Sequence, residues 1–170
     1  MKCIGEVFAW LAIKMHRMAE KLGQRPLYNI VYLDDSSGHL IWFEDMIRPA
    51  REFRFEGFPC ARLAMPHIRE RKPDLVVIDQ MLGSQEPDGL ALAYTIKEAP
   101  HLQDVEVVVI SQYRDRATVE HRATAPGLLY YTQDGVHFMS KQLSRSELIT
   151  SLRDIILAHR SSPQTNSMVA

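Results

Sequence analysis

The sequence has little cysteine and no excess of charge of either sign. Its 170 residues include two cysteines, Cys3 and Cys60, and neither belongs to a Cys-x-x-Cys pair or to a Cys/His zinc-ligand spacing. A disulfide framework is not indicated, and a reducing cytoplasm fits this usage. Twenty lysines and arginines against 21 aspartates and glutamates give a formal net charge of −1. No overall field would therefore attract the chain to nucleic acid or to an anionic membrane.

Long hydrophobic runs are also missing. The apolar stretch at residues 7–13 is too short to span a bilayer, and Lys14, His16 and Arg17 follow it without a small-residue cleavage site. Neither secretion nor a membrane anchor is expected. No internal repeat or low-complexity tract occurs, so the length suits one globular domain with a short appendage.

The N-terminal segment does carry an apolar heptad pattern. Its members recur at spacings of 4, 3, 4, 3 and 4: Ile4, Phe8, Leu11, Met15, Met18 and Leu22. The pattern predicts an amphipathic helix and linker at residues 1–26, with Gly23 and Pro26 ending the helix. Three heptads are short for an independent coiled coil. The helix is therefore expected either to pack on its own domain or to form a homodimer, and a third interpretation places it on a membrane surface.

From residue 27 onward, short continuous apolar runs alternate with longer mixed segments. Such runs are typical of parallel strands that are covered on both faces of a sheet. They occupy residues 27–33, 75–78, 105–110 and 136–140, and residues 53–58 form a further candidate strand.

The mixed segments predict helices at residues 39–48, 61–71, 90–98 and 145–159. Ser144 and Glu147 form a capping box at the start of the last helix. The alternation predicts a doubly wound α/β domain at residues 27–160, followed by a disordered tail at residues 161–170.

The residues that follow the predicted strands are polar: Asp34, Asp35, Asp79, Ser111 and Lys141. In an open α/β sheet, ligands bind outside the carboxyl ends of the strands. Three carboxylates in one place repel one another unless a cation lies among them, and oxygen ligands suit Mg²⁺. One aspartate can then act as a nucleophile toward a phosphoryl group, while a hydroxyl and an ammonium contact the phosphoryl oxygens.

With these residues in this order, the chain resembles the receiver domain of two-component response regulators, including single-domain chemotaxis-type receivers. The resemblance covers about residues 28–159 and rests on the segments YLDDSS, KPDLVVIDQML, PDGLAL, VVVISQ and FMSKQLSRSEL. Asp79 follows Asp35 by 44 residues, which agrees with the usual spacing in that family.

The resemblance implies a flavodoxin-like fold with five parallel strands in the order 2-1-3-4-5. It also implies that Asp79 accepts the phosphoryl group. The expected Mg²⁺ ligands are Asp34, Asp35, Asp79 and the main-chain carbonyl of Met81.

Three further residues have implied roles at the same site. Ser111 and Lys141 would contact the phosphoryl group, and Phe138 would be the aromatic residue that changes rotamer. The implied partners are a histidine kinase or phosphotransfer protein as donor and a downstream protein as target. Such a chain is a self-phosphorylating and autodephosphorylating signalling module of the cytoplasm, not a turnover enzyme.

The sequence also departs from the pattern of the family. Gln112 follows the hydroxyl residue where the family usually has a small one, and Gln142 replaces the usual proline after Lys141. The loop after Asp79 and the segment at residues 112–135 are longer than usual. These departures support an alternative, in which the chain is a receiver-like interaction or dimerisation module whose phosphorylation is vestigial.

Ordinary structural roles remain open for the same residues. The aspartates can cap helices or turns, Ser111 can end a strand, Lys141 can be solvated, and Phe138 can belong to the core. The seven histidines show no metal-ligand spacing and are expected in surface or packing roles, although His39 follows the acidic pair closely enough to lie near the site. A haloacid dehalogenase phosphatase would need a second aspartate where Met81 stands, and no Gly-x-Gly-x-x-Gly or Walker loop indicates nucleotide binding.

Overall fold

The computed structural model describes residues 27–83, 87–112 and 129–161. The predicted N-terminal helix at residues 1–26 lies outside the described residues, as do residues 162–170 of the predicted tail. Ser161, the first residue of that predicted tail, is instead the last residue of a helix.

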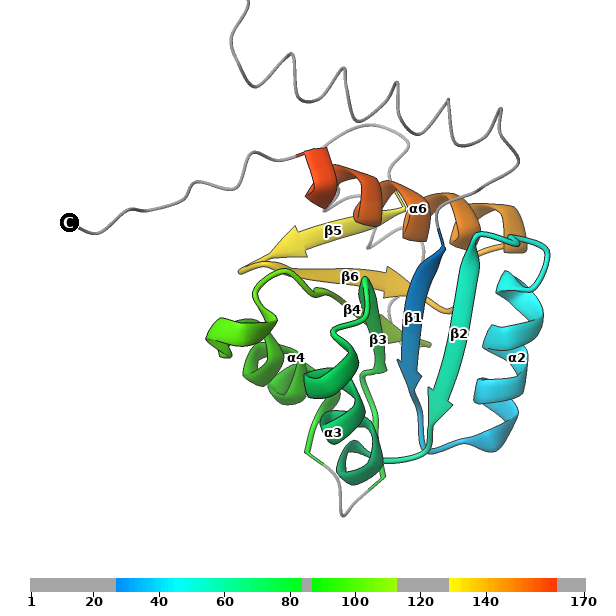
Figure 1. The fold of residues 1–170 in the computed structure, drawn as a ribbon. Helices are drawn as coiled ribbons and strands as arrows, with labels where there is room; N and C mark the ends of the chain where they lie inside the picture. Colours follow the sequence, from blue (N-terminus) through cyan, green and yellow to red (C-terminus); the bar gives the residue numbers. More distant parts are fainter. Residues whose placement is uncertain (1–26, 84–86, 113–128, 162–170) are drawn as a thin grey trace, which may run out of the picture.

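A single twisted sheet runs through the described part of the chain (Figure 1). Its strands lie in the order β2-β1-β3-β4-β6-β5. Their bounds are β1 Tyr28–Leu33, β2 Phe53–Phe58, β3 Leu75–Asp79, β4 Glu106–Ser111, β5 Tyr130–Gln133 and β6 Val136–Ser140. All neighbours pair in parallel except β5, which pairs antiparallel with β6. The five predicted parallel strands and their 2-1-3-4-5 order are confirmed, and β5 is a sixth strand that was not predicted.

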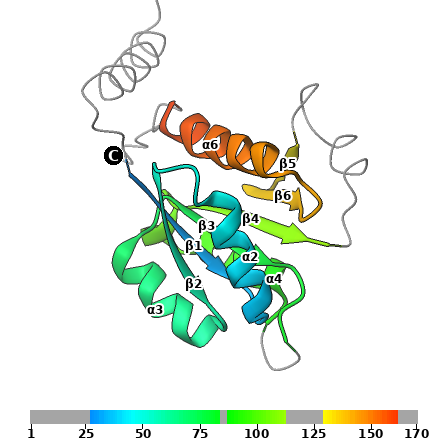
Figure 2. The same cartoon turned by 90° about the vertical axis from the view of Figure 1, so that its right-hand side faces the viewer.

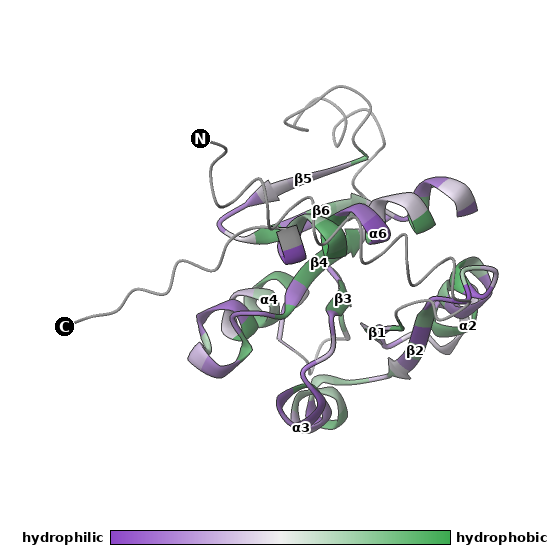
Figure 3. Cartoon of the chain, turned by 45° about the horizontal axis from the view of Figure 1, so that its top comes forward, coloured by the Kyte–Doolittle hydropathy of each residue, from purple (hydrophilic) through white to green (hydrophobic). Residues whose placement is uncertain are grey.

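The burial of the strands explains their continuous apolar runs. Every residue of β3 and β4 is buried, because helices cover both faces of the sheet at its centre. The edge strand β2 has only exposed and half-buried residues. Figure 3 shows β3 and β4 mainly in hydrophobic colours, whereas α3 carries hydrophilic segments.

Within the described ranges, four α-helices flank the sheet: α2 Ser37–Ile47, α3 Ala61–Arg71, α4 Gly89–Glu98 and α6 Arg145–Ser161. A short 3₁₀ helix, η1, spans Pro100–Leu102. Helices α3 and α4 pack on one face of the sheet and α2 and α6 on the other, each pair over its own hydrophobic cluster. In Figure 2, α3 and α6 lie on either side of the strands. The four predicted helices are confirmed to within two residues at each end. The predicted capping box also forms, since the backbone N–H of Ser144 donates to Glu147 Oε2 at 2.8 Å.

The sixth strand forms a tight hairpin with β6. Asp134 and Gly135 make the two-residue turn with φ of 51° and 76°. An Asp-Gly pair favours this turn, because both central residues need positive φ. Opposite each other on the hairpin, Tyr131 and Phe138 stack with their ring centroids 4.9 Å apart. The hairpin therefore covers the edge of β6 that five parallel strands alone would leave open.

Among the residues that the structure describes, no helix combines the length and the apolar character needed to cross a bilayer.

Candidate functional site

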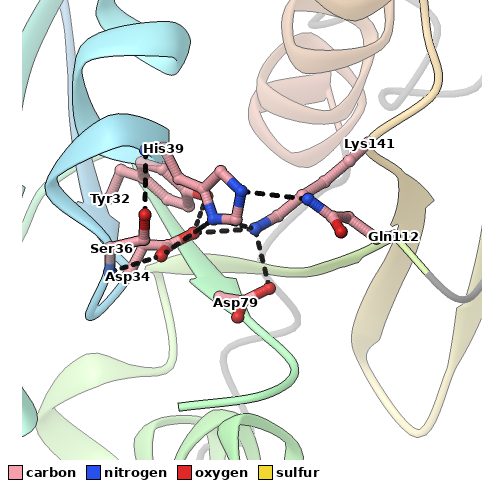
Figure 4. A network of polar contacts seen from close by, with 7 residues as sticks. All are labelled: Tyr32, Asp34, Ser36, His39, Asp79, Gln112 and Lys141. Atoms are coloured by element: carbon pink, nitrogen blue, oxygen red, sulfur yellow. Dashed lines mark hydrogen bonds and ion pairs between the residues drawn. The ribbon is translucent and has the colours of Figure 1, made fainter. Parts of the chain in front are cut away.

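The predicted site residues lie where the carboxyl ends of the strands meet, a part of the sheet that we call the carboxyl edge: Asp34, Asp35, Asp79, Ser111 and Lys141. Figure 4 shows three of them, Asp34, Asp79 and Lys141. Each lies at or just after the carboxyl end of a strand. The register explains why they meet, because Asp79 pairs with Ile110 and Ser111 pairs with Ser140. Parallel strands that end at one level place their next residues side by side.

The three aspartates form an acidic cluster. One oxygen from each of Asp34, Asp35 and Asp79 lies within 4.8 Å of the others. Asp34 is fully buried and Asp79 nearly so, while Asp35 is exposed. Such a set of hard oxygen donors, with one side open to water, suits a divalent cation that keeps several of its own waters.

Lys141 is the main counter-charge within the described residues of this cluster. Its Nζ atom lies 2.7 Å from Asp34 Oδ2 and 2.9 Å from Asp79 Oδ1. The lysine side chain is only 5% exposed, so water screens these ion pairs weakly. The alternative interpretation, in which Lys141 is a solvated surface lysine, is therefore wrong.

The two buried carboxyl groups titrate in opposite directions. Burial raises the pKa of Asp34, but hydrogen bonds from Lys141, Tyr32 and Ser36 outweigh it and leave that pKa below its ordinary value. At Asp79, burial outweighs the attraction of Lys141, and its pKa is raised. Asp34 is thus the more firmly ionised of the pair.

Tyr32 also contacts the acidic cluster. Its role there was not predicted from the sequence. Its hydroxyl donates a hydrogen bond to Asp34 Oδ2, and its buried ring stacks on Phe43 of α2 at 4.4 Å. Burial and the neighbouring carboxylates raise the pKa of Tyr32, so the phenol keeps its proton. The signal was present in the sequence, because residues two apart on a strand face the same side.

His39 lies directly on the site, as its place after the acidic pair suggested. It sits in the first turn of α2, whose N-cap is Ser36. Its Nδ1 atom lies 3.1 Å from Asp34 Oδ2 and 3.1 Å from Lys141 Nζ. Its other ring nitrogen pairs with the side-chain amide of Gln112 at 2.9 Å.

The remaining predicted residues differ in their surroundings. Met81 is exposed beside the cluster, and its backbone hydrogen-bonds to Asp79. Ser111 is buried, and its carbonyl accepts from the backbone N–H of Lys141 at 3.0 Å. Phe138 is buried in the core against Tyr131, in agreement with its structural interpretation; its role as a switch stays a prediction.

Two histidines for which the sequence predicts surface or packing roles, His137 and His159, contact one buried carboxylate in a second polar cluster. Glu106 begins β4, at the edge of the sheet opposite the carboxyl edge. Its carboxylate lies 2.7 Å from His137 Nε2, 2.6 Å from His159 Nδ1 and 3.8 Å from Lys97 Nζ. This cluster joins three elements to β4 and takes no part in the carboxyl edge.

We compared the chain with protein-family models, curated proteins and solved structures, and only the solved structures gave matches. No protein-family model and no curated protein matches the chain. Solved structures do match, including the signal receiver domain of an HD domain-containing protein from Pseudomonas fluorescens Pf-5, at 19% identity and a TM-score of 0.60. The match covers 80% of this chain and 99% of that one.

Two further receiver domains match in the same way. One belongs to a DNA-binding response regulator from Colwellia psychrerythraea 34H, with 17% identity, a TM-score of 0.57, and coverage of 76% and 98% of the two chains. The other is the BeF3-activated receiver domain of DrrB from Thermotoga maritima, with 17% identity, a TM-score of 0.55, and coverage of 76% and 97%. The described chain therefore has the receiver-domain fold, and the resemblance seen in its sequence is confirmed at that level.

Proposed function

We propose that this chain, which has the fold of signal receiver domains, is a response regulator receiver that accepts a phosphoryl group on Asp79 in the cytoplasm. The observation that carries the proposal is the convergence of three carboxylates and a buried lysine on one edge of the sheet. An acidic cluster of this kind is costly to bury without a purpose, because its members repel one another.

In the proposed reaction, a carboxylate oxygen of Asp79 attacks the phosphorus of a phosphohistidine on a histidine kinase or phosphotransfer protein. A P–O bond forms, the P–N bond breaks, and the donor imidazole leaves with the electron pair and takes a proton from solvent. Lys141 and Ser111 are then proposed to contact the transferred phosphoryl oxygens, Ser111 from the neighbouring strand end.

The proposed metal is Mg²⁺, held by Asp34, Asp35, Asp79 and the main-chain carbonyl of Met81. When bound, it neutralises charge on the phosphoryl oxygens. The donor set supports this choice, because it consists of oxygen atoms only. His39 is nearby, but its Nδ1 atom already faces Asp34 and Lys141.

The phosphorylated and free forms are proposed to differ in the surface that they present to a downstream protein, so that the output is a protein contact. The acyl phosphate is lost again by hydrolysis, and the chain turns over only its own phosphoryl group. A homodimer through the N-terminal helix stays a prediction, since residues 1–26 lie outside the described residues.

The test is incubation with acetyl phosphate, with and without Mg²⁺, followed by intact mass. We expect a Mg²⁺-dependent gain of one phosphoryl group that Asp79→Asn abolishes. The matched control is Asp88→Asn, because Asp88 is an exposed aspartate nearby whose side chain caps nothing. If neither acetyl phosphate nor a cognate kinase adds a phosphoryl group, the proposal is wrong, and the interaction module with vestigial phosphorylation becomes the better interpretation.

A further inference from the structure

Two side chains meet across the top of the carboxyl edge, one from α2 and one from the end of β4. His39 and Gln112 are 73 residues apart in the sequence, yet the ring nitrogen of one lies 2.9 Å from the amide of the other (Figure 4). We call this contact the His39–Gln112 bridge. It is a direct link between α2 and the strand that carries Ser111.

The bridge also holds the lysine of the site. His39 Nδ1 lies 3.1 Å from Lys141 Nζ, on the side opposite its contact with Gln112. The ammonium is paired with Asp34 and Asp79 and also lies against the imidazole of His39. Because the Gln112 amide donates to His39 Nε2, the Nδ1 atom carries the ring proton and donates to Asp34, so the bridge holds the imidazole against both Asp34 and Lys141.

The same contact lines a surface cavity, together with the lysine that contacts the acceptor. A surface cavity of about 400 Å³ is lined by His39, Trp42, Gln112, Lys141 and Gln142. Solvent in this cavity reaches the bridge, while the Asp79 side chain is only 10% exposed. The bridge and the lysine beside it thus form part of the boundary between the cavity and the acceptor carboxylate.

We propose that the His39–Gln112 bridge lengthens the lifetime of the phosphoryl group on Asp79, by positioning Lys141 and by restricting the approach of water. The inference rests on the proposed function. In the step that the bridge slows, the oxygen of a water molecule attacks phosphorus and the P–O bond to Asp79 breaks. The carboxylate leaves with the electron pair, and the proton of the water passes to solvent.

The experiment measures the decay of the phosphorylated chain. The full-length protein is loaded with acetyl phosphate and Mg²⁺, freed of donor, and followed by intact mass. Gln112→Ala and His39→Ala are expected to speed decay roughly two- to tenfold, the range that corresponds to loss of one hydrogen bond. The double variant should decay at about the rate of the faster single variant, because the two residues act through one contact.

A matched control separates the bridge from the cavity around it. Gln142→Ala removes another glutamine side chain from the same cavity, but Gln142 makes no hydrogen bond to His39 among the described residues. The phosphorylated Gln142→Ala variant should therefore decay at the rate of the natural chain. A second measurement separates positioning from general damage. The Mg²⁺ concentration that gives half-maximal loading should be unchanged in Gln112→Ala, since among the described residues Gln112 hydrogen-bonds to His39 and not to the three aspartates.

The outcomes distinguish failure of the proposed function from failure of the proposed role of the bridge. A natural chain that gains no phosphoryl group would overturn both the proposed function and the bridge. A loaded chain whose variants decay at the natural rate, or more slowly, would overturn the bridge alone. A shifted Mg²⁺ requirement in Gln112→Ala, or faster decay in Gln142→Ala, would likewise show that the His39–Gln112 contact is not what protects the phosphoryl group.

Discussion

The positions of single residues at the carboxyl edge depend on backbone geometry, and only part of that geometry can be predicted from the sequence. The strand-end positions of Asp34, Asp79 and Lys141 could be predicted, because an apolar run has a visible end. The contact of His39 with Gln112 could not, because it depends on how α2 is rotated against the sheet. Tyr32 lay between these cases, since the two-residue period of a strand places it on the same side as Asp34.

Position 89 gives the clearest case in which the structure requires one particular residue type, glycine. A Cβ atom there would lie 2.0 Å from the carbonyl oxygen of Asp79. That oxygen belongs to the backbone and cannot move away unless the end of β3 shifts. Helix α4 therefore begins in contact with the end of β3, and only glycine permits that approach.

We expect Gly89→Ala to lower the free energy of unfolding by ~1–3 kcal/mol, the usual cost of overpacking, or more if β3 moves. The control is Gly38→Ala in α2, where the nearest atom to a new Cβ is Ser36 Oγ at 3.6 Å. That substitution should be neutral or should stabilise by up to ~1 kcal/mol, because alanine favours the helix. Urea unfolding of both variants measures the difference, and equal stabilities would contradict the close approach.

Elements differ in how well sequence predicted them, and burial accounts for the difference. The strands β3 and β4 are buried on both faces, so their apolar runs are unbroken and easily recognised. The strand β5 has only four residues, with one buried and two exposed, and so it has no comparable run. Its best signal was the Asp134-Gly135 turn, which is specific for hairpins but says nothing about which sheet edge the hairpin joins.

Glu106 shows how one buried carboxylate joins several elements. It begins β4 and pairs with Lys97 of α4, His137 of β6 and His159 of α6. Burial raises the pKa of Glu106, but the hydrogen bond from His137 and the charges of Lys97, His137 and His159 outweigh it and lower that pKa overall. Ionised Glu106 is thus favoured in the folded chain over the unfolded one.

A lowered pKa of an acid gives a definite sign to the pH dependence. The contribution of Glu106 to stability is complete above its unfolded pKa of about 4.3 and is lost as the pH falls through its lower folded pKa. We expect Glu106→Gln to cost ~1–3 kcal/mol at pH 7 and to lose less on acidification than the natural chain. Glu98→Gln, on an exposed position of α4, is the matched control. Parallel stability curves from pH 7 to pH 3 for the natural chain and Glu106→Gln would refute this role.

At the scale of the whole molecule, two polar clusters lie at opposite ends of the strands and differ in how their charges are balanced. The Glu106 cluster is compensated by side chains from α4, β6 and α6, and it stabilises the fold. The carboxyl edge has three carboxylates against the ammonium of Lys141, and its shortfall of positive charge is what a bound cation would supply. The fold thus tolerates local repulsion at the site, in the way that functional sites commonly trade stability for chemistry.

This imbalance predicts that Mg²⁺ reverses the order of stability of two proteins. Without the ion, Asp35→Asn should unfold at the same or a higher urea concentration than the natural chain, because it removes a repelling charge at an exposed position. With Mg²⁺ in excess, the natural chain should become the more stable, since binding to the folded state adds ~2.7 kcal/mol at a hundred times the dissociation constant. Asp88→Asn should follow the natural chain in both conditions, because it lies outside the acidic cluster. If Mg²⁺ shifts all three proteins equally, the ion does not bind at these carboxylates, and the folded chain tolerates their repulsion with Lys141 as counter-charge and no metal.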